Sequence, residues 1–167
     1  LLWSASALYR ATGDARFNTL FLERFGPAGF RTRWTLAAWG PMMKWQYIRC
    51  EQPGTDKRLA DKLKQDVITS ANWQVEKSID AEAYRWGGDS SRGMGWGNAN
   101  GGGHYADVQL RAWWLTGEQK YLDTACLNAD FQLGCNPLSK TFITGMGARP
   151  PLHPQISSFL YDKPAKR

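Results

Sequence analysis

A short pattern that occurs twice limits the fold of this chain more than any other feature. "TGDARF" (12–17) and "TGEQKY" (116–121) each place one glycine between two stretches with helical periodicity. Glycine tolerates the left-handed backbone that closes a helix, and the acid after it favours the start of the next helix. The aromatic residue is then placed to pack back onto the pair. Each pattern therefore predicts a corner between two helices, and two corners predict stacked helical hairpins.

Apolar residues recur at helical spacing through most of the chain. This spacing predicts helices over 1–12, 15–25, 34–39, 42–50, 56–78, 104–116 and 118–133. The first is apolar enough to be mostly buried. Pro41 suits the first turn of the fourth, and Thr55 or Asp56 should cap the fifth. Alternation of period two is missing, and only residues 142–143 have strand-like composition. We therefore predict an all-α chain.

Length and charge exclude several classes. The 167 residues fit one domain, and 43% hydrophobic content allows a sizeable core. Repeats of 34 or 40 residues are missing, which counts against tetratricopeptide and HEAT arrays. The net charge of +6 is spread along the chain, and the densest basic run, 57–64, alternates with acids as a solvated helix face does. We expect neither nucleic-acid binding nor a membrane span, since apolar runs fall short of roughly 20 residues.

The three cysteines predict neither a metal site nor a disulfide. The sequence contains no CxxC pair and no histidine cluster, so a zinc site is not expected. A helix through most of the span between Cys126 and Cys135 would separate them by roughly 13 Å, beyond disulfide reach. We expect all three to be buried free thiols.

A glycine-rich segment, 79–103, lies between two predicted helices and contains eight of the seventeen glycines. Large aromatic residues, Tyr84, Trp86 and Trp96, are interleaved with these glycines, which is not typical of a flexible linker. Phenol and indole faces stack on the apolar face of a sugar ring, so we expect a carbohydrate-binding loop. The alternative is that Trp86 and Trp96 anchor the loop on the helices.

The segment after the last predicted helix, 134–155, is long and irregular, as working surfaces or disordered linkers are. Its sequence, "LGCNPL" followed by "TFITGMGARPPLHP", resembles the closing part of a family 9 glycoside hydrolase, the family of endoglucanases and cellodextrinases. "MGWGNAN" (94–100) and the "LYRATGD" corner also resemble segments of that family. The residues that fit the family signature are Thr141, Ile143, Thr144, Gly147, Arg149 and Pro154.

The resemblance implies a six-hairpin α/α barrel with an open cleft and an inverting hydrolysis of β-linked glycans. Inversion uses one carboxylate to activate water and one carboxylic acid to protonate the leaving oxygen. The family's segments for both carboxylates do not occur in this sequence, so no catalytic residue is assigned. Glu82 and Asp89 lie in the glycine-rich segment, and we interpret them as solvated loop acids. No metal is expected, although the resemblance allows calcium, which some relatives bind.

The signature breaks after Pro154, where Gln155 replaces a histidine and Ser157 replaces an arginine. Gln155 is neutral at every pH and Ser157 is too short to replace a guanidinium fork. A polar site with different hydrogen-bonding groups binds the family's usual ligand poorly, because buried polar groups are left unpaired. We therefore expect a differently substituted or branched β-glycan as substrate rather than plain cellulose. In the alternative alignment, shifted by two residues, His153 is the family's histidine.

The sequence therefore predicts part of a barrel enzyme that acts outside the cytoplasm, secreted or periplasmic. Within 1–167 we expect helical hairpins over 1–78, a glycine-rich cleft loop over 79–103, a hairpin over 104–133 and a cleft loop over 134–167. Helices average about 16–20 residues with their connections, so twelve do not fit and other segments must complete the barrel. The residues expected to bind substrate are Tyr84, Trp86, Trp96, Arg149, His153 and Gln155.

Two other classes remain open. A polysaccharide lyase on a similar α/α barrel would use a tyrosine and histidine pair in a basic cleft, and His104 with Tyr105 fits that requirement. A non-catalytic helical protein that binds sugars or serves as a scaffold would have no need of the missing carboxylates.

Overall fold

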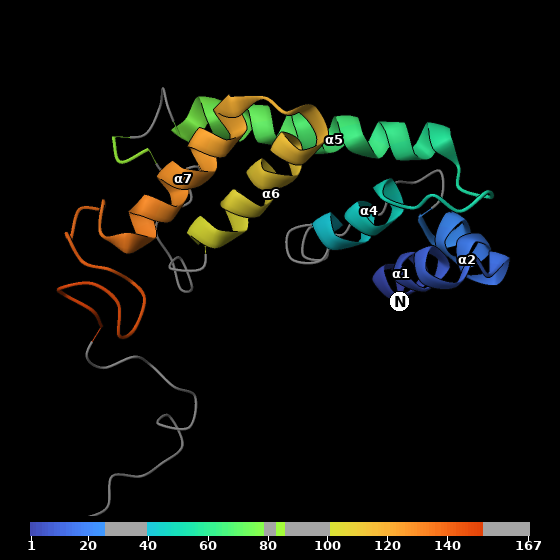
Figure 1. Cartoon of the computed structure of the whole chain (residues 1–167), viewed down its shortest axis with the longest axis horizontal. Helices are drawn as coiled ribbons and strands as arrows, with labels where there is room; N and C mark the ends of the chain where they lie inside the picture. Colours follow the sequence, from blue (N-terminus) through green and yellow to red (C-terminus); the bar gives the residue numbers. More distant parts are fainter. Residues whose placement is uncertain (26–39, 79–82, 86–100, 152–167) are drawn as a thin grey trace, which may run out of the picture. The chain divides into compact units, whose positions relative to one another are not determined.

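The computed structural model describes residues 1–25, 40–78, 83–85 and 101–151, with the backbone alone at 40–41 and 101–105. Six helices lie in these ranges: α1 (Leu2–Thr12), α2 (Ala15–Phe25), α4 (Gly40–Ile48), α5 (Lys57–Glu76), α6 (Gly101–Thr116) and α7 (Gln119–Leu133) (Figure 1). The described ranges contain no strand, which agrees with the predicted all-α class. The chain divides into two compact units, Leu1–Asn72 and Trp73–Arg167.

Most helix boundaries agree with the prediction to within two residues. Pro41 lies in the first turn of α4, and residues 77–78 continue α5 as a π-helical turn. The exception is α6, which begins at Gly101 rather than at His104. Each glycine costs a helix about 1 kcal/mol relative to alanine, so the sequence argued against helix there. Packing of α6 along α7 overrides that preference. The predicted helix over 34–39 lies outside the described residues.

The two repeated corners share one backbone geometry. Gly13 has a φ of 71° and Gly117 a φ of 73°. The Gly13 N–H donates to the Tyr9 carbonyl at 2.8 Å, and the Gly117 N–H donates to the Trp113 carbonyl at 2.7 Å. A non-glycine residue would be strained in this left-handed conformation. The predicted glycine corners are confirmed.

The threonines before these glycines also have the same role at both corners. Thr12 Oγ1 accepts the Asp14 N–H, and Thr116 Oγ1 accepts the Glu118 N–H, both at 3.2 Å. Asp14 then starts the next helix, because its carboxylate accepts the Arg16 N–H at 3.0 Å. The Glu118 side chain makes no capping bond to α7. Thus each corner uses one threonine to bridge two helices.

In the first unit, α1 packs against both α2 and α4. The ring of Phe21 stacks on that of Tyr47, with 4.4 Å between centroids. The buried apolar side chains of this unit are Leu2, Ala5, Tyr9, Phe21, Met43, Tyr47, Ile48, Cys50, Ala60, Leu63, Val67 and Ala71. Trp3 and Leu8 are each 43% exposed, so the prediction of a mostly buried first helix is wrong. Burial is confined to one face of α1, which carries Leu2, Ala5, Ser6 and Tyr9.

The Tyr47 hydroxyl links three segments of this unit. It donates to Asn18 Oδ1 at 3.1 Å and accepts the Asp56 N–H at 3.0 Å. Asn18 Nδ2 in turn donates to the Gly54 carbonyl at 2.7 Å. Asp56 caps α5 by accepting the Leu59 N–H at 3.0 Å, so it is one of the two caps that we predicted. Burial raises the pKa of Tyr47, although the bond from the Asp56 N–H partly offsets this.

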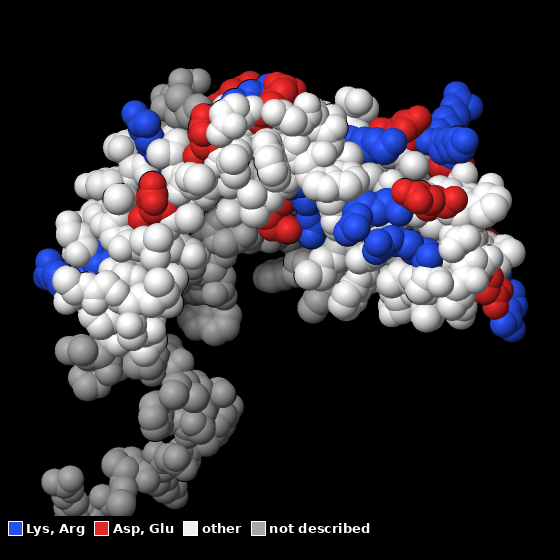
Figure 2. All heavy atoms as spheres, viewed as in Figure 1, with Lys and Arg blue, Asp and Glu red and all other residues white. Residues whose placement is uncertain are grey.

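Charges on the first unit are of both signs. Lys64 pairs with Asp61 on α5 at 2.8 Å, and Lys44 on α4 pairs with Asp66 at 3.1 Å. Figure 2 shows basic and acidic side chains next to one another on the visible face. The alternation of charge along the start of α5 therefore agrees with a solvated helix face. Among the described helices, none is both long enough and apolar enough to cross a bilayer.

In the second unit, α6 and α7 form an antiparallel hairpin around the Gly117 corner (Figure 1). Buried polar side chains join this hairpin to the end of α5. Gln109 Nε2 donates to Gln74 Oε1 at 3.0 Å, and Asn128 Nδ2 donates to Ser78 Oγ at 3.4 Å. The buried apolar side chains are Ala112, Tyr121, Ala125 and Phe131. The hairpin brings the carboxyl end of α7 to the same end as the amino end of α6.

Asn136 holds the chain that leaves α7. This side chain is 4% exposed. Its Nδ2 donates to the Phe131 carbonyl at 2.7 Å and to the Lys140 carbonyl at 2.8 Å. Its Oδ1 accepts the Leu138 N–H at 3.1 Å. One amide therefore joins the last turn of the helix to both sides of the following loop.

A second set of hydrogen bonds holds the loop at Thr141, five residues after Asn136. Thr141 Oγ1 donates to the Gln132 carbonyl at 3.3 Å and accepts the Ile143 N–H at 3.1 Å. The Phe142 N–H donates to the same Gln132 carbonyl at 2.8 Å. Residues 142–143 lie in bends of this loop, so their strand-like composition does not produce a strand. The Phe142 N–H bonds to the end of α7 instead of to a neighbouring strand.

Replacing Tyr47 by phenylalanine should destabilise the intact protein by about 1–3 kcal/mol, because the Asp56 N–H and the Asn18 carbonyl lose a partner. Because the pKa of Tyr47 is raised in the folded state, its protonated hydroxyl stabilises the fold. This stabilisation is fully present below the unfolded tyrosine pKa of about 10 and is lost as pH rises through the folded pKa. Urea unfolding at several pH values measures both effects. Tyr84→Phe, at a half-exposed residue, is the control. A Tyr47→Phe variant as stable as the parent would contradict this role.

Replacing Asn136 by alanine should release the loop from α7, because three hydrogen bonds are lost. The carbonyls of Phe131 and Lys140 would then lack the donor that Asn136 supplies. We expect a loss of roughly 2–4 kcal/mol in local stability. Hydrogen exchange at the Phe142 amide reports this directly, because that amide bonds to α7. Asn136→Asp is the matched variant, as it keeps the acceptor for Leu138 and loses the two donated bonds. Unchanged exchange in Asn136→Ala would show that the loop is held by other contacts.

Candidate functional site

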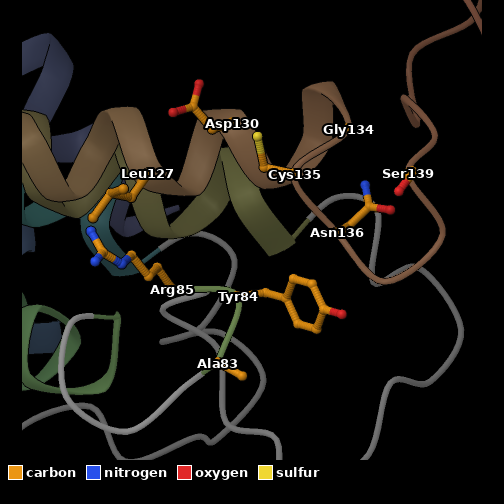
Figure 3. A pocket seen from close by; sticks show the side chains of 9 residues that line it. All are labelled: Ala83, Tyr84, Arg85, Leu127, Asp130, Gly134, Cys135, Asn136 and Ser139. Atoms are coloured by element: carbon orange, nitrogen blue, oxygen red, sulfur yellow. The ribbon is translucent and has the colours of Figure 1, made fainter.

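A hollow of about 440 Å³, open to solvent, lies at the carboxyl end of α7 (Figure 3). Three short stretches of the second unit form its walls: residues 83–85, the last turns of α7, and the loop that follows. The lining residues are Ala83, Tyr84, Arg85, Leu127, Asp130, Gly134, Cys135, Asn136 and Ser139. We call it the α7 hollow. It brings residues of both predicted cleft loops together.

Local backbone geometry explains how α7 and its loop form one wall. Leu127 and Asp130 project from successive turns of the helix. Gly134 ends the helix with a φ of 134°, and its N–H donates to the Asp130 carbonyl at 3.1 Å. The Cys135 N–H shares that carbonyl at 2.9 Å. Asn136 then folds the loop back through hydrogen bonds, and the ring of Phe142 packs edge to face on that of Phe131, with 5.9 Å between centroids.

The opposite wall supplies an aromatic ring and a guanidinium. Tyr84 is 49% exposed. Figure 3 shows its ring extending toward the loop that carries Asn136, while the Arg85 side chain extends toward Leu127 on α7. Together with Asp130, the lining holds one cation and one anion. Such a wall suits a neutral ligand with hydroxyl groups and one apolar face.

The described structure includes two of the six predicted binding residues. Tyr84 lines the α7 hollow. Arg149 is exposed on the following loop and does not line this hollow. The other four, Trp86, Trp96, His153 and Gln155, lie outside the described residues, as do Glu82 and Asp89. The side chains of His104 and Tyr105 also lie outside the description.

Sequence reasoning did not predict five polar lining residues as part of a site: Arg85, Asp130, Cys135, Asn136 and Ser139. The only signal for Cys135 and Ser139 was their place in a long irregular segment. Arg85 follows Tyr84 in the glycine-rich segment, but nothing in its type distinguishes it from other arginines. Its role depends on the approach of two segments about fifty positions apart in the chain, which is a tertiary property.

The cysteine prediction is partly wrong. All three thiols are free, and Cys50 is buried as expected. Cys126 and Cys135 are exposed, because the first lies off the buried face of α7 and the second lies in the loop that lines the hollow. Within the described ranges, no group of three or more histidine, cysteine or acidic residues is placed to hold a metal ion.

The motif at the end of α7 has a clear structural reason. Asn136 binds both the helix end and the loop, and Thr141 repeats this a few residues later. Gly147 has a φ of 73°, and a Cβ there would lie 3.4 Å from the Thr141 methyl group. The residues that carry the family resemblance in this stretch therefore build the loop on which further side chains are presented.

Two curated relatives match most of the chain. One is a xyloglucan-specific endo-beta-1,4-glucanase of Bacteroides ovatus, 27% identical over 91% of this chain and 26% of the relative. The other is endoglucanase B of Cellulomonas fimi, 28% identical over 92% of this chain and 15% of the relative. The chain thus spans about a quarter or less of the length of these proteins.

Solved structures agree on the fold. A metagenome-derived family 9 endoglucanase matches with a TM-score of 0.77 and 24% identity, over 90% of this chain and 27% of that one. Endoglucanase J30 of the same family and its zinc-binding triple mutant each match with a TM-score of 0.75 and the same identity and coverage. The predicted fold class, part of an all-α barrel, is thereby confirmed.

The model for glycosyl hydrolase family 9 matches residues 1–165, almost the whole chain. The chain therefore belongs to glycosyl hydrolase family 9.

Proposed function

We propose that the protein hydrolyses β-1,4 bonds of a glucan outside the cytoplasm, with inversion at the anomeric carbon. The match of the family 9 model over residues 1–165 carries this proposal. The names of both relatives, an endo-beta-1,4-glucanase and an endoglucanase, support the linkage class. Both are glucan-cleaving enzymes, so hydrolysis is favoured over a lyase reaction or simple sugar binding.

This chain supplies substrate-binding residues rather than the catalytic carboxylates. The hairpin of α6 and α7 places two irregular segments at one of its ends, and the α7 hollow lies there. Substrate would contact aromatic and polar side chains on those segments: Tyr84, Trp86, Trp96, Arg149, His153 and Gln155. The range 79–103 and the range 134–167 act as cleft loops in this proposal.

Inversion requires a pair of carboxyl groups. One activates water and the other protonates the leaving oxygen, and the two stand roughly 6.5–9.5 Å apart to admit that water. In this proposal the remaining segments of the catalytic domain supply both groups. The residues of this chain contribute by holding the glycan in register with them, which lowers the entropy cost of the reaction. No metal or organic cofactor takes part in these steps.

The substrate is proposed to be a substituted β-1,4-glucan. The family signature breaks at Gln155 and Ser157, where this chain replaces a histidine and an arginine with neutral side chains. One relative is named as xyloglucan-specific, and xyloglucan is a glucan that carries xylosyl substituents. A changed polar site and a relative with a substituted substrate both favour this class over plain cellulose.

The intact protein should cleave xyloglucan oligosaccharides faster than cello-oligosaccharides of the same backbone length. The first product should carry the α-anomeric reducing end, because inversion converts the β-linkage. Proton NMR during the first minutes of the reaction measures both. A β-anomeric first product would contradict inversion, and an unsaturated product would identify a lyase. Binding without cleavage would place the protein among non-catalytic sugar-binding proteins.

A matched pair of variants tests the broken signature. Gln155→Ala should lower kcat/KM for the substituted oligosaccharide about tenfold, the effect of one lost hydrogen bond to the bound glycan. His153→Ala should have a smaller effect if the alignment without a shift is correct. Steady-state kinetics on substituted and plain oligosaccharides compares them. Rapid turnover of the plain oligosaccharide, abolished by His153→Ala and untouched by Gln155→Ala, would show instead that His153 is the family's histidine.

A further inference from the structure

The α7 hollow concentrates unfavourable backbone geometry. Among the described residues, two that are not glycine have a positive φ: Arg85 at 55° and Ser139 at 48°. Both line the hollow, one from each wall. Left-handed backbone is unfavourable for residues with a Cβ, and such residues cluster at ligand-binding sites, where surrounding contacts hold them. The coincidence of both with one hollow therefore points to a ligand.

The side chains at the hollow indicate what kind of ligand this is. Tyr84 is half exposed and offers a flat phenol face. Arg85 offers a planar fork of donors, while the Ser139 hydroxyl and the Asp130 carboxylate can accept hydrogen bonds. One positive and one negative group leave no net charge to attract an ionic ligand. A pyranose has one apolar face and several hydroxyl groups, and it matches this lining.

We infer that the α7 hollow binds one neutral pyranose unit of the glycan, with Tyr84 stacked on the ring and Arg85 donating to its hydroxyl groups. This inference rests on the proposed function for the choice of a glycan. The volume of about 440 Å³ lies in the range of small-molecule sites, roughly 300–1,000 Å³. The bound unit is either a backbone glucosyl residue or a pendant sugar, and the test below separates these.

The exposed thiol of Cys135 provides a direct reporter, because it lines the hollow. Cys126 is also exposed and does not line it, so it serves as the internal control. The intact protein is treated briefly with iodoacetamide, with and without a cello-oligosaccharide or a xylosylated oligosaccharide of equal backbone length. Cleavage before Asp130 then places the two cysteines on separate peptides for mass spectrometry.

A bound sugar should slow the alkylation of Cys135 by about tenfold at roughly nine times the dissociation constant and leave Cys126 unchanged. Protection by both oligosaccharides identifies a backbone unit, and protection by the xylosylated one alone identifies a pendant sugar. Tyr84→Ala should weaken the affinity for the protecting ligand about three- to tenfold. Arg85→Asn should also weaken it while keeping the fold, since asparagine tolerates a positive φ.

Two outcomes separate this inference from the proposed function. Cleavage of the oligosaccharide with no protection of Cys135, or with equal protection of Cys126, overturns the binding site and leaves the enzyme assignment intact. The second outcome is a protein that cleaves neither oligosaccharide but whose Cys135 is protected, with weaker protection in Tyr84→Ala. This result supports the binding site and overturns hydrolysis. Protection that both variants leave unchanged also overturns the site, because the ligand would then lie elsewhere.

Discussion

The left-handed glycine at each helix corner is the constraint on which the rest of the structure depends. Gly13 and Gly117 adopt nearly the same φ, and each closes one helix with a backbone hydrogen bond. At each corner a threonine hydroxyl then accepts the N–H of the residue that precedes the next helix. The reversal at Gly117 returns α7 along α6. Residues 83–85 and the loop after α7 meet at one end of the hairpin. That end carries the α7 hollow.

The polar residues of the family motif in the loop after α7 have a structural role. Asn136 and Thr141 use their polar atoms on the backbone of the same loop and of α7. Groups used in this way are not available to a substrate. Tyr84 and Arg85 extend from the facing wall of the α7 hollow. The polar residues of the motif therefore build the loop itself.

Several expectations failed where a side chain's surroundings, rather than its type, decided the outcome. Trp3 and Leu8 are partly exposed although they are large and apolar, and two of three cysteines are exposed. Conversely, Gln74, Gln109 and Asn128 are buried in the second unit. Burial of these amides is tolerated because they donate to or accept from one another or their neighbours. Amino-acid composition does not show which polar side chains will find hydrogen-bond partners in the interior.

The sequence by itself determined the helices, the corners and the family, since helical periodicity, a glycine that must adopt positive φ and a long motif are local properties. It also predicted two cleft loops, and Tyr84 of the first one lines the α7 hollow. Only the tertiary structure decided that Arg85 and Ser139 face one hollow, that α6 begins inside a run of glycines and that polar side chains form the interior of the second unit. These depend on contacts between residues distant in the chain, and packing energy there outweighs local preference.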